Sequence, residues 1–121
     1  MLTISSTTKI FLCMTPIDMR KSFDSLAGIV QDGMGYDSFT GHMFVFRNRE
    51  ETKMKILYWE RDGYAIWYKR LEKGTFKLPA AAAGFEVEAT EFMMLLNGIE
   101  PTSISKQERY SRKGALAGSS V

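Results

Sequence analysis

The sequence predicts a single-domain α+β fold. Its centre is a mainly antiparallel β-meander of three to four strands, with one helix in the N-terminal half and a C-terminal helix. Apolar residues recur at helical spacing before Gly41 and alternate at strand spacing after it. The links between the later strands are short, and such links join antiparallel strands. A chain of 121 residues with 45% hydrophobic residues suits one modest core, which we place in residues 1–100.

The N-terminal half should hold a short strand followed by a helix. Residues 10–14 form an apolar run that ends at Pro16, because proline cannot donate to a strand ladder. Asp18 then suits a helix N-cap, whose carboxylate accepts from free backbone N–H groups. Gly33 and Gly35 should stop this helix. Its apolar stripe would consist of Met19, Phe23, Leu26, Ala27 and Val30.

The meander should contain strands over residues 42–48, 53–60 and 64–71, joined by turns at 49–52 and 61–63. The pair Asp62-Gly63 between apolar strands is a strong hairpin signal. If Asn48 pairs with Lys53 and Arg61 pairs with Tyr64, the side chains sort onto two faces. One face would carry Phe44, Phe46, Leu57, Trp59, Ile66 and Tyr68. The other would carry Met43, Val45, Met54, Ile56, Tyr58, Ala65 and Trp67, fringed by Arg47 and Lys69.

Both faces of this predicted sheet are apolar, so each needs a cover. The chain's own helices could bury both faces, or a partner could cover part of one. Residues 79–84 suggest a surface connection, and a second helix is expected over residues 90–97 with Phe92 and Leu96 on its apolar stripe. Residues 101–121 form a basic tail, which we expect to be flexible.

Several functional classes find no support in the composition. The single cysteine, Cys13, excludes a disulfide framework and a zinc site built on cysteine pairs. No apolar run is long enough for a membrane helix, which predicts a cytoplasmic protein without a membrane partner. His42 is the only histidine, and no metal-ligand spacing or phosphate-binding loop occurs. We therefore expect no cofactor, no metal and no catalytic residue.

Cations interleaved with aromatic residues give the strongest functional signal, since they suit phosphates and stacked bases. The same cations on strand edges also guard against aggregation, so the pattern alone leaves both readings open. The candidate residues for binding nucleic acid or a protein partner are Arg20, Lys21, Arg47, Arg49, Lys55, Tyr58, Trp67, Lys69 and Arg70.

Four segments in order resemble a known family. They are Pro-Ile-Asp-Met-Arg-Lys-Ser-Phe at 16–23, Gly-His-Met-Phe-Val-Phe-Arg-Asn-Arg at 41–49, Lys-Ile-Leu-Tyr-Trp-Glu-Arg-Asp-Gly at 55–63 and Trp-Tyr-Lys-Arg-Leu-Glu-Lys-Gly-Thr-Phe at 67–76. A weaker match follows at 95–99. The set resembles the TnpB-type accessory proteins of the sixty-six (IS66-like) family of insertion sequences. The motif positions that we interpret as structural are Asp18, Gly41, Trp59, Asp62, Gly63 and Gly74.

The resemblance implies a non-catalytic accessory protein that assists a separate transposase in DNA transposition. Its expected partners are the transposase, the other accessory protein of the element, and DNA. One alternative is a small metal-dependent DNA-processing enzyme, which Asp18 and Asp62 clustering around a metal would favour. Another is a purely structural dimeric adaptor that never contacts DNA. The oligomeric state stays open at this point.

Overall fold

The fold of the computed structural model, which describes residues 4–78 and 86–97, is α+β as predicted. A five-stranded sheet runs in the order β4-β3-β2-β1-β5. Its strands are β1 (Ile10–Leu12), β2 (Met43–Arg47), β3 (Lys53–Glu60), β4 (Gly63–Arg70) and β5 (Glu86–Val87). The expected connection at 79–84 and the basic tail lie outside the described residues.

The sheet extends beyond the predicted meander of β2, β3 and β4. β1 pairs parallel to β2, and β5 pairs antiparallel to β1. The parallel pairing is possible because the chain leaves the sheet after β1, passes through a helix and returns as β2. β5 contains two residues, too few for an alternating pattern to announce it.

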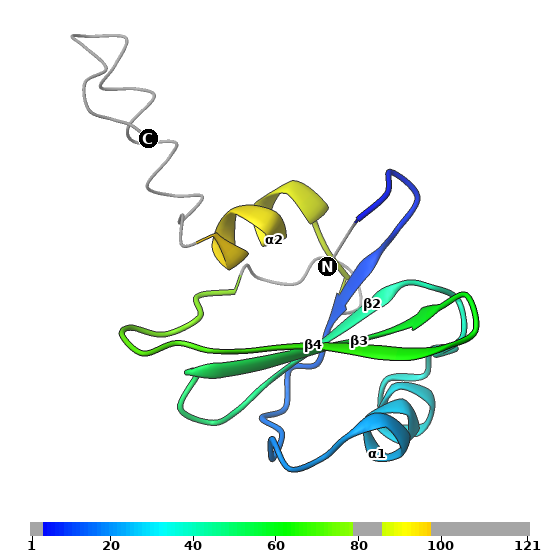
Figure 1. Ribbon diagram of the computed structural model, residues 1–121, viewed down its shortest axis with the longest axis horizontal. Coiled ribbons are helices and arrows are strands. Elements are labelled where there is room, and N and C mark those ends of the chain that lie inside the picture. Colours follow the sequence, from blue (N-terminus) through cyan, green and yellow to red (C-terminus); the bar gives the residue numbers. More distant parts are fainter. Residues whose placement is uncertain (1–3, 79–85, 98–121) are drawn as a thin grey trace, which may run out of the picture.

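The helices lie on opposite faces of the sheet (Figure 1). The first, α1 (Phe23–Gly28), continues as a π-helical stretch, η1 (Ile29–Met34). It ends at Gly35 as expected, but Gly33 lies inside it and does not stop it. The second, α2 (Ala89–Leu96), lies within one residue of its predicted bounds. Leu26 and Val30 of the first helix pack on the face that carries Phe44, Phe46 and Leu57. Phe92 and Leu96 of α2 pack on the opposite face with Val45, Met54 and Ile56.

These two clusters confirm the predicted assignment of side chains to the two faces of the sheet. They also settle how the middle of the sheet is covered, because the chain's own helices bury both faces there. The first hairpin has the predicted register, in which Arg47 pairs with Met54. The second register was wrong: Glu60 pairs with Gly63, so Gly63 begins β4 and does not belong to the turn. A positive φ of 54° at Arg61 allows this shorter turn, and the shift of two residues leaves each side chain on its predicted face.

The predicted start of the first helix was also wrong. Asp18 does not cap it; the helix begins at Phe23 with Ser22 at the N-cap position. The carboxylate of Asp18 instead accepts from the backbone N–H of Arg20 and pairs with its guanidinium. These local bonds close a turn before helical geometry starts. Met19 therefore precedes the helix, and Phe23 is 44% exposed rather than buried in its stripe.

Candidate nucleic-acid interface

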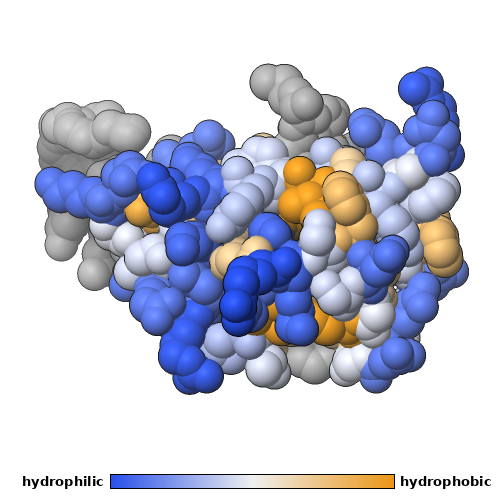
Figure 2. Space-filling model, turned by 60° about the horizontal axis from the view of Figure 1, so that its bottom comes forward, coloured by the Kyte–Doolittle hydropathy of each residue, from blue (hydrophilic) through white to orange (hydrophobic). Residues whose placement is uncertain are grey.

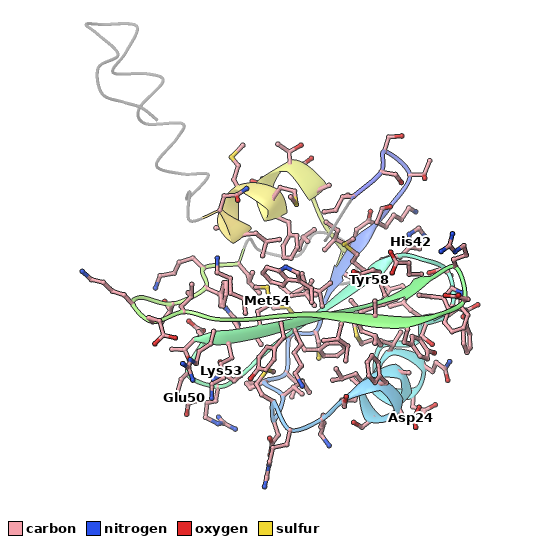
Figure 3. The ribbon with its side chains drawn as sticks, viewed as in Figure 1. Asp24, His42, Glu50, Lys53, Met54 and Tyr58 are labelled. Carbon is pink, nitrogen blue, oxygen red and sulfur yellow. The ribbon has the colours of Figure 1, made fainter. Side chains whose placement is uncertain are left out.

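A cleft of about 530 Å³ opens at the end of the sheet where β3 begins. One wall is the segment before α1, and the other is the turn between β2 and β3. Its lining comprises Pro16, Ile17, Asp18, Met19, Arg20, Asn48, Arg49, Glu50, Lys53 and Tyr68. Three of the four motif segments thus contribute to one concavity. In Figure 3, Glu50 and Lys53 lie together at this end, while His42 lies at the opposite end.

Lys55 supports one wall of this cleft from the sheet. Its side chain is buried, and its ammonium donates to the backbone carbonyls of Met19 and Lys21 at 2.8 Å each. The same ammonium lies 4.8 Å from the centre of the Tyr68 ring. Lys55 therefore ties the segment before the helix to the sheet and steadies the aromatic ring. Its charge is used internally, so we remove Lys55 from the set of residues that could meet phosphate.

Asp18 and Arg20 form an exposed ion pair on the cleft wall. The Arg20 guanidinium donates to both carboxylate oxygens, with the shortest contact at 2.7 Å. Asp18 also accepts from the Arg20 backbone N–H at 2.9 Å. The hydrogen bonds from the Arg20 side chain and then its backbone lower the pKa of Asp18 to about 2. The pair lies at the surface and leaves most of the Arg20 side chain in solvent.

This geometry makes a pH-dependent prediction. Because the pKa of Asp18 lies below its ordinary value of 3.8, the pair stabilises the fold fully above that value and loses its contribution as pH falls through about 2. An NMR titration of the carboxyl carbon should give that low pKa. Arg20→Ala should return the pKa toward 3.8, whereas Lys21→Ala should change it little, since Lys21 acts only through a weaker charge effect. An ordinary pKa in the unmodified protein would contradict the pairing.

Arg49 and Lys53 are the other cations that line the cleft, and Arg70 lies next to Lys53 without lining it. Lys53 and Arg70 are direct partners across the β3–β4 ladder, and Arg49 lies in the adjoining turn. Arg70 forms an exposed ion pair with Glu72 at 2.9 Å. Among the residues that the structure describes, Arg49 and Lys53 form no ion pair. Hydrophilic side chains predominate over the left half of the face that Figure 2 shows.

Four predicted residues lie on the other face of the sheet, away from the cleft. Arg47 donates to the Phe76 carbonyl at 3.2 Å and pairs with Glu51 at 3.5 Å. Tyr58 and Trp67 pack against the cluster beneath α2. Burial, with a smaller effect of Glu60, raises the pKa of Tyr58. Lys69 lines a separate hollow near the end of α2. The structure does not bring these four together with the cleft residues.

The glycine and aromatic motif positions have structural explanations. Gly41 and Gly74 both adopt positive φ, at 88° and 79°, which side chains rarely tolerate. Trp59 meets Phe39 and Tyr64 edge-on, with ring centres 5.1 Å apart in each case. This aromatic cluster closes the end of the sheet opposite the cleft.

Asp18 and Asp62 do not converge. Asp62 lies in the β3–β4 turn after Glu60, whereas Asp18 lines the cleft beside Lys53. The length of β3 separates these ends by about 23 Å at roughly 3.3 Å per residue. Within the described ranges, no three His, Cys, Asp or Glu side chains are arranged to hold a metal ion. The condition that would favour a metal-dependent enzyme built on these two acids is therefore not met.

Sequence reasoning found Arg20 and Arg49 but missed Lys53 and Tyr68 as cleft residues. Lys21 is exposed beside the wall without lining the cleft. A signal for the missed pair existed: Lys53, Lys55 and Tyr68 share one face under the alternation rule. What the alternation could not show is that the segment before the helix folds over this end of the face.

Comparison with known proteins identifies relatives along most of the chain. The family model described as "IS66 Orf2 like protein" matches residues 8–106. The uncharacterized protein y4hO of Sinorhizobium fredii is 31% identical over 101 residues, covering 83% of this chain and 88% of that protein. The uncharacterized protein y4jC of the same organism is 27% identical over 100 residues, covering 82% and 86%. No solved structure matches. Within the described residues, no helix has the length and apolar character needed to cross a membrane.

Proposed function

Because the chain belongs to the IS66 Orf2-like family of insertion-sequence proteins, we propose that it is a non-catalytic factor that assists a separate transposase by binding element DNA at its cleft. The transposase and the element's other accessory protein would be its protein partners. The observation that supports DNA as a ligand is the gathering of Arg20, Arg49 and Lys53 around one concavity beside an exposed aromatic ring. The lining also holds two acids, Glu50 and Asp18, of which Asp18 pairs with Arg20. Arg49 and Lys53, which form no ion pair among the described residues, are the cations that suit phosphates.

The arrangement of charges supports this proposal over the alternative that the cations only prevent aggregation at a strand edge. Cations that only guard a strand edge need no concave setting. Here Lys53 faces Arg70 directly across the ladder, and like charges in that position repel. A phosphate between them would turn the repulsion into attraction. The exposed Arg70–Glu72 pair offers little resistance, because surface ion pairs are worth roughly 0–1 kcal/mol.

A double substitution tests the proposal. Arg49→Ala with Lys53→Ala should weaken binding to duplex DNA from the element ends and make the slope of log K against log salt less negative by about 1.8, or about 0.9 per lost phosphate contact. Fluorescence anisotropy over a series of salt concentrations measures both. The matched control is Lys69→Ala with Lys73→Ala, which removes two cations from the hollow on the other face. That control should leave the slope nearly unchanged.

The outcomes separate the alternatives. Equal effects of the two double variants would show a non-specific attraction of cations to DNA and contradict the cleft assignment. If the protein does not bind DNA, while Arg49→Ala with Lys53→Ala disrupts co-purification of the transposase, the cleft binds protein instead. If no partner binds and the protein sediments as a dimer, the structural adaptor is favoured.

A further inference from the structure

We infer that the cleft accepts unpaired, single-stranded DNA, with one base stacked on the ring of Tyr68. This inference rests on the proposed function and specifies which form of DNA the site recognises. It starts from the side chain of Tyr68, which lines the cleft and is 50% exposed. The aromatic ring of Tyr68 is therefore exposed to solvent at a charged site, although burial would be the usual place for an apolar ring.

The ring is held in place for a ligand. The Lys55 ammonium lies over it, 4.8 Å from its centre, and is itself anchored by two carbonyls at 2.8 Å. A cation on one side of the ring leaves the exposed side for a flat partner. Because the ring's support is buried and doubly hydrogen-bonded, a base that stacks there would order little of the protein, which lowers the entropic cost of binding.

The shape of the site favours a single strand over a duplex. Proteins read duplex DNA with a convex element, such as a helix or β-ribbon, that enters a groove. This site is instead a concavity of about 530 Å³ with an aromatic floor. A base in a duplex already stacks on its neighbours, so its flat face cannot reach Tyr68. A base in a single strand can, and base–aromatic stacking with nearby cations is the usual mode for single strands.

The cations are placed to meet the phosphates next to such a base. Lys55–Tyr68 and Lys53–Arg70 are successive pairs on the same face of the β3–β4 ladder. Lys53 and Arg70 therefore lie one step along the strands from the ring, and Arg49 borders the same cleft. An acidic peptide would suit these cations but would make no use of the flat ring. The combination of ring and cations is what points to a nucleotide strand.

Binding of short labelled oligonucleotides to the full chain tests the inference. A single-stranded 12-mer from the element end should bind at least about fivefold more tightly than the same sequence as a duplex. Tyr68→Leu should weaken binding of the single strand by about 5- to 150-fold, the range expected for loss of one stacked base. Tyr68→Phe keeps the ring and should stay within about twofold. Phe39→Leu, which removes an exposed aromatic ring beside Trp59, is the matched control and should have no effect.

A second measurement does not depend on substitutions. Ultraviolet cross-linking of a strand that carries 5-bromouracil should attach the base to the peptide containing Tyr68 in the unmodified protein. Adducts only at other peptides would overturn the inference, as would an unchanged affinity of Tyr68→Leu or competition by polyglutamate as strong as that by the oligonucleotide. If the duplex binds and responds to Arg49→Ala with Lys53→Ala while the single strand binds no better, the proposed function stands and this inference falls. If neither form of DNA binds, DNA binding itself is refuted.

Discussion

Replacement of Phe92 by alanine is expected to lower the free energy of unfolding by about 3–5 kcal/mol, the usual cost of deleting a fully buried phenyl ring. Phe92 is 1% exposed and lies in the middle of α2, facing the sheet. Its ring belongs to the cluster that contains Ile10, Met54 and Ile56. Among the described elements α2 is the only helix on this face, so no second helix can move in to fill the cavity.

Urea denaturation followed by circular dichroism would measure this change. Thr90→Ala is the matched control, since Thr90 is exposed on the same helix and its replacement should alter stability by no more than about 0.5 kcal/mol. A loss below about 1 kcal/mol for Phe92→Ala would mean that α2 does not cover this face in solution. The apolar side chains of Met54 and Ile56 would then be available to a partner, the alternative that the sequence alone left open.

Strand periodicity explains why the meander could be predicted so closely. β3 spans the predicted residues 53–60, and every residue assigned to a face lies there, because parity survives a register error of two residues. Local turn chemistry is a weaker guide. Asp18 and Ser22 are both residue types that cap helices, and the sequence does not show that a guanidinium two residues away would engage the carboxylate of Asp18.

The site was less predictable than the fold, because it depends on contacts between distant segments. A lysine in an alternating strand normally points to solvent, yet Lys55 reaches the carbonyl of Met19, 36 positions away in the chain. Tyr68 looked like one more apolar residue of a buried face, but it lies near the end of the edge strand β4, where the layer that contains α1 no longer covers it. The cations Arg20 and Arg49 could be recognised by type, but their grouping with Lys53 required the fold.

The second large effect concerns Lys55, which links the fold to the cleft. Lys55→Met preserves most of the side chain's length and apolar stem but removes the ammonium. The carbonyls of Met19 and Lys21 then lose their donor, and the Tyr68 ring loses the cation over its face. Hydrogen bonds to a charged group contribute roughly 1.5–3 kcal/mol each, so the loss of two is expected to lower the free energy of unfolding by about 3–6 kcal/mol.

Lys53→Met provides the matched control, because it lies two residues earlier on the same strand and face and makes no side-chain hydrogen bond among the described residues. It should change stability by less than about 0.5 kcal/mol while weakening DNA binding. Lys55→Met should instead cause a large loss of stability. It should also weaken DNA binding under conditions where the variant remains folded, because the cleft wall is no longer tied to the sheet. If Lys55→Met proved as stable as the unmodified protein, its ammonium would have to lie in solvent, and the cleft would need a different support.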